Sequence, residues 1–215
     1  MNIPAVTNED IIRYTKMFNK LNPALEKLME ETNQRTDVLP CIQRDTACFL
    51  QFIIQREKPL KILELGTAVG ISTITMALVL PENGHITTVE RGHMFVAEAE
   101  KNFENFKLNH KITQILGDVT EVVPNLQGDF DLIFQDSGKQ TYLPLLDDLV
   151  RLLRPGGLLI ADDTLFPAMD LPERNQKSQR AVNRFNQAVF AHPRLKSFIL
   201  PIGHGITIAE KDKNS

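Results

Sequence analysis

The stretch "KILELGTAVGIST", residues 61–73, places two glycines between a short apolar run and a segment of small residues. The apolar run predicts a buried strand, and the segment after Gly70 predicts a helix. Gly66 and Gly70 therefore predict a tight strand-to-helix turn whose backbone a ligand can approach closely. In an open α/β sheet, ligands bind beyond the carboxyl ends of the strands, where such turns lie.

The spacing of these glycines narrows the kind of ligand. It reads G-x-x-x-G, and Ala68 stands where the dinucleotide-binding fingerprint has its second glycine. This disfavours a dehydrogenase that binds a pyrophosphate. Taken alone, the two glycines are weak evidence for a ligand site, because a tightly packed strand-to-helix turn that binds nothing has the same pattern.

The rest of the chain predicts the fold around this turn. Helical periodicity covers residues 8–21, 22–35 and 42–57, with Asn22 and Pro23 as a cap and first helical residue. From residue 61 onward, short apolar strands alternate with helices, which predicts a mostly parallel sheet with helices on both faces. The expected strands are 61–65, 85–90, 112–117, 130–134, 157–161, 195–201 and 205–211. The last two are joined by so short a turn that they must form an antiparallel hairpin.

We therefore expect a single α/β domain over residues 1–215, with N-terminal helices in 1–58 and a seven-stranded core in 59–211. The formal charge of −3 argues mildly against a general affinity for nucleic acid. No apolar run approaches the roughly 18–20 residues of a membrane span, and the N-terminus has no secretory signal. We expect a cytoplasmic protein with no membrane partner.

Acidic residues follow two of the expected strands. Glu90 ends the second strand, where its carboxylate could accept both hydroxyls of a ribose. Asp118 follows the third, where it could accept from an exocyclic amine or cap the next helix. Together with the glycine turn, these acids suit a nucleoside that carries a small charged group.

Three more acids end the fourth and fifth strands: Asp136, Asp162 and Asp163. If these strands are neighbours, the carboxylates converge and repel one another. A hard divalent cation such as Mg²⁺ would relieve the repulsion, because it prefers oxygen ligands. The alternative is that Asp136 caps a helix and the other two are loop acids.

Lys139 begins the helix after Asp136, where a positive charge is unfavourable for helix stability. Near a dication and partly buried, its pKa should fall, and neutral lysine could then act as a general base. The alternative is an ordinary surface lysine. Tyr142, one turn later, is expected to be a packing residue.

The histidines are scattered and are expected on the surface or in loops: residues 85, 93, 110, 192 and 204.

These stretches resemble the cation-dependent O-methyltransferases of the S-adenosylmethionine (SAM) class, which include catechol and caffeoyl-coenzyme A O-methyltransferases and many small bacterial members. The resemblance covers nearly the whole chain and implies a Rossmann-like class I methyltransferase fold. "ELGTAVGIST" resembles the cofactor loop, "VER" the ribose acid, "GDV" the adenine-side motif, and "FQDSGKQTY" and "ADDTLF" the metal segments. The resemblance implies these SAM contacts: Glu64, Gly66, Thr67, Gly70, Ser72, Glu90, Asp118 and Asp136.

The resemblance also implies a cation (Mg²⁺, or another such as Mn²⁺ or Ca²⁺) on Asp136, Asp162 and Asp163, with Lys139 as the catalytic base and Asp136 beside it. Asp163 stands where the family usually has asparagine, and "QDSG" replaces the usual apolar-Asp-Ala. The implied reaction transfers the SAM methyl group to a hydroxyl of a vicinal diol on a small aromatic acceptor. Family members are often homodimers.

Two other functions stay open. Small bacterial relatives of this length methylate a hydroxylated uridine in tRNA, which the acidity of this chain mildly disfavours. A non-catalytic module that binds SAM or a nucleotide would keep the glycines and Glu90 but would need neither the three acids nor Lys139. Residues 166–180, which contain Phe166, Lys177 and Arg180, are expected to be a loop that walls the site or lies in solvent.

Overall fold

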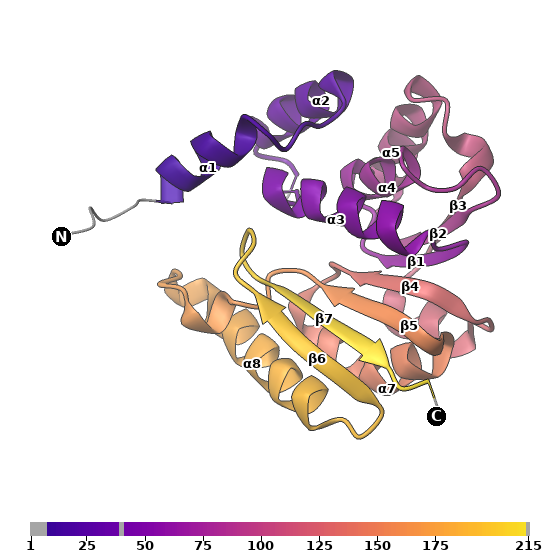
Figure 1. Cartoon of the computed structure of the whole chain (residues 1–215), viewed down its shortest axis with the longest axis vertical. Coiled ribbons are helices and arrows are strands. Elements are labelled where there is room, and N and C mark those ends of the chain that lie inside the picture. Colours follow the sequence, from indigo (N-terminus) through magenta and orange to yellow (C-terminus); the bar gives the residue numbers. More distant parts are fainter. Residues whose placement is uncertain (1–7, 39–40, 214–215) are drawn as a thin grey trace.

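The computed structural model describes residues 8–38 and 41–213, which form a sheet between two layers of helices (Figure 1). The strands are β1 (Lys61–Leu65), β2 (His85–Glu90), β3 (Ile112–Leu116), β4 (Phe130–Gln135), β5 (Leu153–Ala161), β6 (Leu195–Leu200) and β7 (Ile206–Lys211). The α-helices are α1 (Asn8–Lys16), α2 (Pro23–Asn33), α3 (Arg44–Glu57), α4 (Ile71–Ala77), α5 (His93–Asn105), α6 (Val119–Val122), α7 (Tyr142–Leu152) and α8 (Gln176–Ala191). The 3-10 turns are η1 (Asn109–Lys111), η2 (Val123–Asn125), η3 (Lys139–Thr141), η4 (Phe166–Ala168) and η5 (Glu173–Asn175).

The sheet has the strand order β3-β2-β1-β4-β5-β7-β6. The first five of these are mutually parallel, and β7 runs antiparallel to both β5 and β6. The predicted mostly parallel sheet and its antiparallel hairpin are confirmed. Because Ala161 pairs with Thr207, β7 begins beside the end of β5. The β6–β7 turn therefore lies at the same edge of the sheet as the tips of the parallel strands.

A separate apolar core fills each side of the sheet. Ile62 of β1 joins the cluster under α2 to α5, whereas Leu63 and Leu65 join the cluster under α7 and α8. Because both faces are buried, β1 reads as one apolar run rather than an alternating one. Glu64 interrupts that run on the α4 side, which already marks it as unusual.

The N-terminal helices agree with the sequence patterns. The Oδ1 atom of Asn22 accepts hydrogen bonds from the backbone N–H of Ala24 at 2.9 Å and of Leu25 at 3.4 Å, so the predicted cap of α2 is confirmed.

Within residues 8–38 and 41–213, no helix combines the length and the apolar character that a membrane crossing needs.

Two boundaries differ from the prediction. Strand β5 begins at Leu153, before its two glycines, because Leu153 already pairs with Phe130 and a register shift accommodates the residues that follow. Helix α8 begins at Gln176, so the prediction of a single loop over 166–180 was wrong. Polar residues at 176–178 extend the helix on its solvent side, where apolar periodicity gives no signal.

Candidate active site

The glycine turn between β1 and α4 is packed against the tip of β4. Gly66 has φ +100°, and a Cβ added there would lie 2.6 Å from the carbonyl oxygen of Asp136. Gly70 has φ +88°, and its Cβ would lie 2.5 Å from Cε1 of Phe103. Both glycines are therefore required for packing, as the alternative reading of the sequence held. The close approach of Gly66 also places the turn beside the first of the three predicted metal acids.

A fully buried polar network lies under this turn. The Oε2 atom of Glu64 accepts hydrogen bonds from the hydroxyls of Thr73 and Thr88, the latter at 2.6 Å. Thr67 and Thr88 share a further hydroxyl–hydroxyl bond of 2.6 Å, so the Thr67 side chain belongs to the network. The Oε1 atom of Glu64 has no protein partner. Burial raises the pKa of Glu64 to about 7, although the hydroxyls of Ser72, Thr73 and Thr88 act against this rise.

Glu90 and Asp118 lie at the ends of β2 and β3. The carboxylate of Glu90 accepts the backbone N–H of Ala68 at 2.9 Å and that of Gly92 at 2.8 Å. It thereby ties the glycine turn to the end of β2. Asp118 caps α6 by accepting from the backbone N–H of Thr120 at 2.9 Å, as the sequence allowed. Its ligand role stays a prediction.

Lys139 lies between two of the three acids that follow β4 and β5, Asp136 and Asp163, and the third, Asp162, is near enough for their charges to act on its pKa. The Nζ atom of Lys139 is 2.9 Å from Oδ1 of Asp136 and 2.9 Å from Oδ2 of Asp163. Asp162 is 3% exposed, and its Oδ1 accepts the backbone N–H of Asp163 at 2.9 Å. Asp163 has φ +59°, a left-handed conformation that asparagine and aspartate tolerate best among residues with a side chain.

The charges of this cluster shift one another's pKa values. Burial raises the pKa of Asp162 well above its usual range, and the charges of Asp136 and Asp163 add to the rise. Burial likewise raises the pKa of Asp136, despite the ammonium of Lys139. Burial would also raise the pKa of Asp163, but the hydrogen bond from His204 and the ammonium of Lys139 outweigh burial and lower it.

The pKa of Lys139 moves in the direction opposite to the one expected from sequence. Burial alone would lower it, but the charges of Asp136, Tyr142 and Asp163 outweigh burial and hold it well above its ordinary value. The expected fall in the pKa assumed a nearby divalent cation. The protein groups that surround the ammonium are acidic, and they raise the pKa instead. In these surroundings, the lysine is a proton donor and an ion-pair partner.

Tyr142 contributes more than the packing expected of it. Lys139 Nζ donates to its hydroxyl at 2.8 Å. The hydroxyl in turn lies 3.0 Å from the carbonyl oxygen of Gln135 and 3.1 Å from that of Asp162, to which it donates. Tyr142 thus joins the tips of β4 and β5 to the lysine, which fixes the position of Nζ.

His204 was expected only as a surface or loop residue, and its contact with the cluster was missed. It lies in the β6–β7 turn, with Nδ1 3.1 Å from Oδ1 of Asp163, and this hydrogen bond raises its pKa. Part of this contact could have been predicted from the sequence. His204 stands between two glycines in a tight turn, and an antiparallel last strand beside β5 would place that turn near the tip of β5.

Phe166 supplies one wall of the cluster, as predicted. Its ring centroid is 5.9 Å from that of His204 and 5.8 Å from Nζ of Lys139. Gln179 of α8 holds the backbone of this wall by donating to the carbonyl oxygens of Phe166 at 3.0 Å and Met169 at 2.8 Å.

With this geometry in place, comparison with known proteins identifies the family. The sequence profile of a family described as O-methyltransferase matches residues 16–212. The chain belongs to this O-methyltransferase family. A catechol O-methyltransferase of Niastella koreensis is 34% identical over 157 residues, which cover 71% of this chain and 71% of that protein. A caffeoyl-CoA O-methyltransferase of Stellaria longipes is 26% identical over 209 residues, covering 92% and 87%.

Solved structures share the fold of this O-methyltransferase. A methyltransferase of Podospora anserina, bound to S-adenosylhomocysteine (SAH), superposes with a TM-score of 0.86 at 21% identity, covering 99% of each chain. The O-methyltransferase TomG of Streptomyces achromogenes, in complex with SAM, gives a TM-score of 0.80 at 21% identity, covering 95% and 96%. The predicted family and fold class are confirmed, as is the enzyme class, a SAM-dependent O-methyltransferase, at the level of the family.

Proposed function

We propose that this enzyme transfers the methyl group of SAM to one hydroxyl of a vicinal diol on a small aromatic acceptor, with the help of a divalent cation. The observation that carries the proposal is the position of Lys139, whose Nζ lies 2.9 Å from both Asp136 and Asp163 at the tips of β4 and β5. A relative named catechol O-methyltransferase supports the choice of a diol.

The donor set fits a hard divalent cation in kind. Asp136, Asp162 and Asp163 offer only carboxylate oxygens, which Mg²⁺ and Mn²⁺ prefer. In the described part of the chain, no three His, Cys, Asp or Glu side chains are arranged so that they could hold a metal ion as they stand. Because the Lys139 ammonium lies between two of the carboxylates, cation binding would require it to give up an ion pair. We propose these three acids as the cation ligands.

Lys139 is the proposed base of the reaction. When bound, the cation would supply the charge that lowers the pKa of an acceptor hydroxyl. The same cation, bound on the three acids, would offset the negative charges that hold the pKa of Lys139 high, and neutral Lys139 would then accept the proton of that hydroxyl while Tyr142 holds Nζ in place at 2.8 Å. When bound, SAM would supply the methyl group, which would pass from its sulfur to the freed oxygen as the carbon–sulfur bond breaks, with SAH as the second product.

We propose that SAM lies over the glycine turn. Each oxygen of Glu90 already accepts one backbone N–H and keeps a further lone pair for a ribose hydroxyl. Oε1 of Glu64 lacks a protein partner and would accept a hydrogen bond from the cofactor. The hydroxyl of Ser72 acts on the same carboxyl group. Thr67 would contribute its backbone, since its hydroxyl is bound to Thr88. Asp118 would accept from the adenine amine.

We also propose that the enzyme forms a homodimer through α1. Ile12, Tyr14 and Phe18, in and just after this helix, are 53%, 63% and 65% exposed, and a second copy would cover them. Light scattering after size exclusion should give twice the chain mass for the wild type, and Tyr14→Ser/Phe18→Ser should shift it to the monomer. A wild type that stays monomeric at tens of micromolar contradicts the proposal.

The acceptor is tested by methyl transfer from labelled SAM. The proposal predicts labelled product with catechol and little with a phenol that lacks the neighbouring hydroxyl. Undermodified tRNA should not be labelled above background. Methylation of tRNA without methylation of catechol would replace the proposed acceptor by the nucleic acid, and no transfer to any acceptor would contradict the function itself.

A further inference from the structure

Two different segments of the chain hold the side chain of Asp163. Its Oδ2 atom lies 2.9 Å from Nζ of Lys139 in η3, and its Oδ1 atom lies 3.1 Å from Nδ1 of His204 in the β6–β7 turn. A carboxylate oxygen can only accept a hydrogen bond, so Nδ1–H of His204 is the donor. A neutral histidine and a charged one can both carry this proton, so the hydrogen bond does not require a charge on His204.

The β6–β7 turn that carries His204 is fixed to the segment that follows Asp163. The backbone N–H of Leu165 donates to the carbonyl oxygen of His204 at 2.9 Å. The backbone N–H of Thr164 donates to the carbonyl oxygen of Gly205 at the same distance. A Cβ added at Gly205 would lie 2.5 Å from the backbone nitrogen of Leu165, so the two segments are in direct backbone contact.

Helix α3 also holds this turn. Asp45 lies in the first turn of α3, and its Oδ2 atom accepts the backbone N–H of Gly203 at 3.0 Å. A Cβ added at Gly203 would lie 2.6 Å from Oγ1 of Thr46, which is fully buried. The turn is therefore clamped between α3 and the segment after β5, and the position of His204 is fixed from both.

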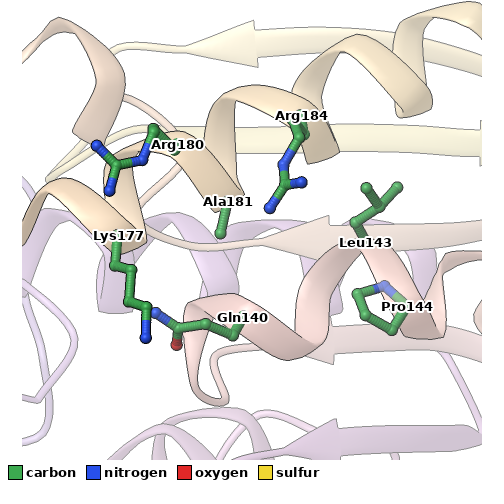
Figure 2. A pocket seen from close by; sticks show the side chains of 7 residues that line it. All are labelled: Gln140, Leu143, Pro144, Lys177, Arg180, Ala181 and Arg184. Atoms are coloured by element: carbon green, nitrogen blue, oxygen red, sulfur yellow. The ribbon is translucent and has the colours of Figure 1, made fainter.

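The Lys139 side of Asp163 is packed less tightly. A Cβ added at Gly138, which precedes Lys139, would meet no atom within 4 Å. Beyond the lysine, η3 borders a hollow of about 540 Å³ between α7 and α8, and Figure 2 shows Gln140 and Lys177 extending toward each other beside it. Segment η3 therefore has room to shift when a cation makes Lys139 give up its ion pair, whereas the clamped turn keeps His204 in place.

We propose that His204 is a positioning residue for the cation: it holds Asp163 by Oδ1 and leaves Oδ2 to bind the cation once Lys139 gives up its ion pair. The inference rests on the proposed function, because it takes Asp163 as a cation ligand. A hydrogen-bond partner that fixes a ligand in advance raises metal affinity, and its loss typically weakens metal binding about tenfold to a hundredfold.

The test is Mn²⁺ binding to the enzyme, measured from the electron paramagnetic resonance signal of the Mn²⁺ that stays free. We expect His204→Ala to weaken Mn²⁺ binding about tenfold or more. In His204→Asn, the amide nitrogen takes the place of Nδ1 and donates without a charge, so its affinity should stay within about threefold of the wild type. The matched control His110→Ala removes an exposed histidine of η1, next to β3 at the opposite edge of the sheet, and should leave the affinity unchanged.

Equal Mn²⁺ affinity of His204→Ala and the wild type overturns the inference while the proposed cation site stands. Tighter binding by His204→Ala also overturns it, because the imidazole would then act as a competing positive charge. Equally weak binding by His204→Ala and His204→Asn overturns it as well, since the hydrogen bond would not be what the imidazole contributes.

Asp162→Ala assigns the bound Mn²⁺ to the acid cluster, because it should abolish the binding without touching His204. If the wild type binds no Mn²⁺, or if Asp162→Ala binds it as tightly as the wild type does, the proposed cation site is wrong and the inference is overturned with it.

Discussion

At Lys139, two carboxylates and a phenol hold one ammonium group. Asp136 and Asp163 each lie 2.9 Å from Nζ, and Tyr142 lies 2.8 Å from it. Removing the amine should remove the proposed base while the glycine turn stays intact. We expect Lys139→Ala to lower kcat by about a hundredfold or more, the usual contribution of a general base, with SAM affinity nearly unchanged.

Lys196→Ala, which removes an exposed lysine on β6, is the matched control and should keep wild-type turnover. Steady-state kinetics with labelled SAM, together with calorimetric SAM binding, separates the two effects. Turnover of Lys139→Ala close to that of the control would remove the lysine from the chemistry.

Glu64 should make the stability of the fold depend on pH. Its pKa is about 7 in the folded protein against an ordinary value of 4.5. The fold therefore holds the proton more tightly than the unfolded chain does. Well below pH 4.5, Glu64 is protonated in both the folded and the unfolded protein, and its full contribution to stability is present. As the pH rises from about 4 to about 8, the unfolding free energy falls by roughly 3 kcal/mol.

Glu64→Gln cannot titrate, so it should lose this pH dependence and keep an oxygen that accepts from Thr73 and Thr88. We expect urea denaturation to show the variant gaining stability relative to the wild type by roughly 3 kcal/mol between about pH 4 and pH 8. Parallel stability curves over that range would mean that the carboxyl is not held protonated by burial.

At the scale of the element, the β1–α4 turn depends on the absence of a side chain at Gly66. Alanine there would combine a left-handed φ of +100° with a Cβ only 2.6 Å from the carbonyl oxygen of Asp136. We expect Gly66→Ala to lower the unfolding free energy by about 2 kcal/mol or more.

Gly138 offers the matched control, because its φ is −55° and a Cβ there meets no atom within 4 Å. Gly138→Ala should change the unfolding free energy by less than about 1 kcal/mol. Chemical denaturation of both variants measures the difference. Equal effects of the two substitutions would show that the close packing of the turn against β4 is not what requires glycine.

The sequence predicts those elements whose pattern is local. Strand β1, the turn after it and the acids at the strand tips can be read from neighbouring residues, and the cap at Asn22 follows from its own chemistry. The start of α8 could not be predicted in this way, because residues 176–178 are polar and give no apolar periodicity, and only packing of the following turns extends the helix through them.

At the scale of the whole molecule, the cluster exists because four chain segments meet at one edge of the sheet. The order β1-β4-β5-β7 brings together the tips of three strands and the turn before the fourth. The sequence predicts the strands but not their order, so it could place Asp136, Asp162 and Asp163 only on the condition that β4 and β5 are neighbours. The contact of His204 with Asp163 depends on the position of β7 and was missed for that reason.

The central claim is that this cluster performs cation-dependent methyl transfer. The most direct measurement is the initial rate of methyl transfer from labelled SAM to catechol, before and after removal of divalent cations by EDTA and again after Mg²⁺ is restored. We expect the rate to fall to background with EDTA and to return with Mg²⁺. A rate that EDTA leaves unchanged would contradict a role for a divalent cation in the reaction.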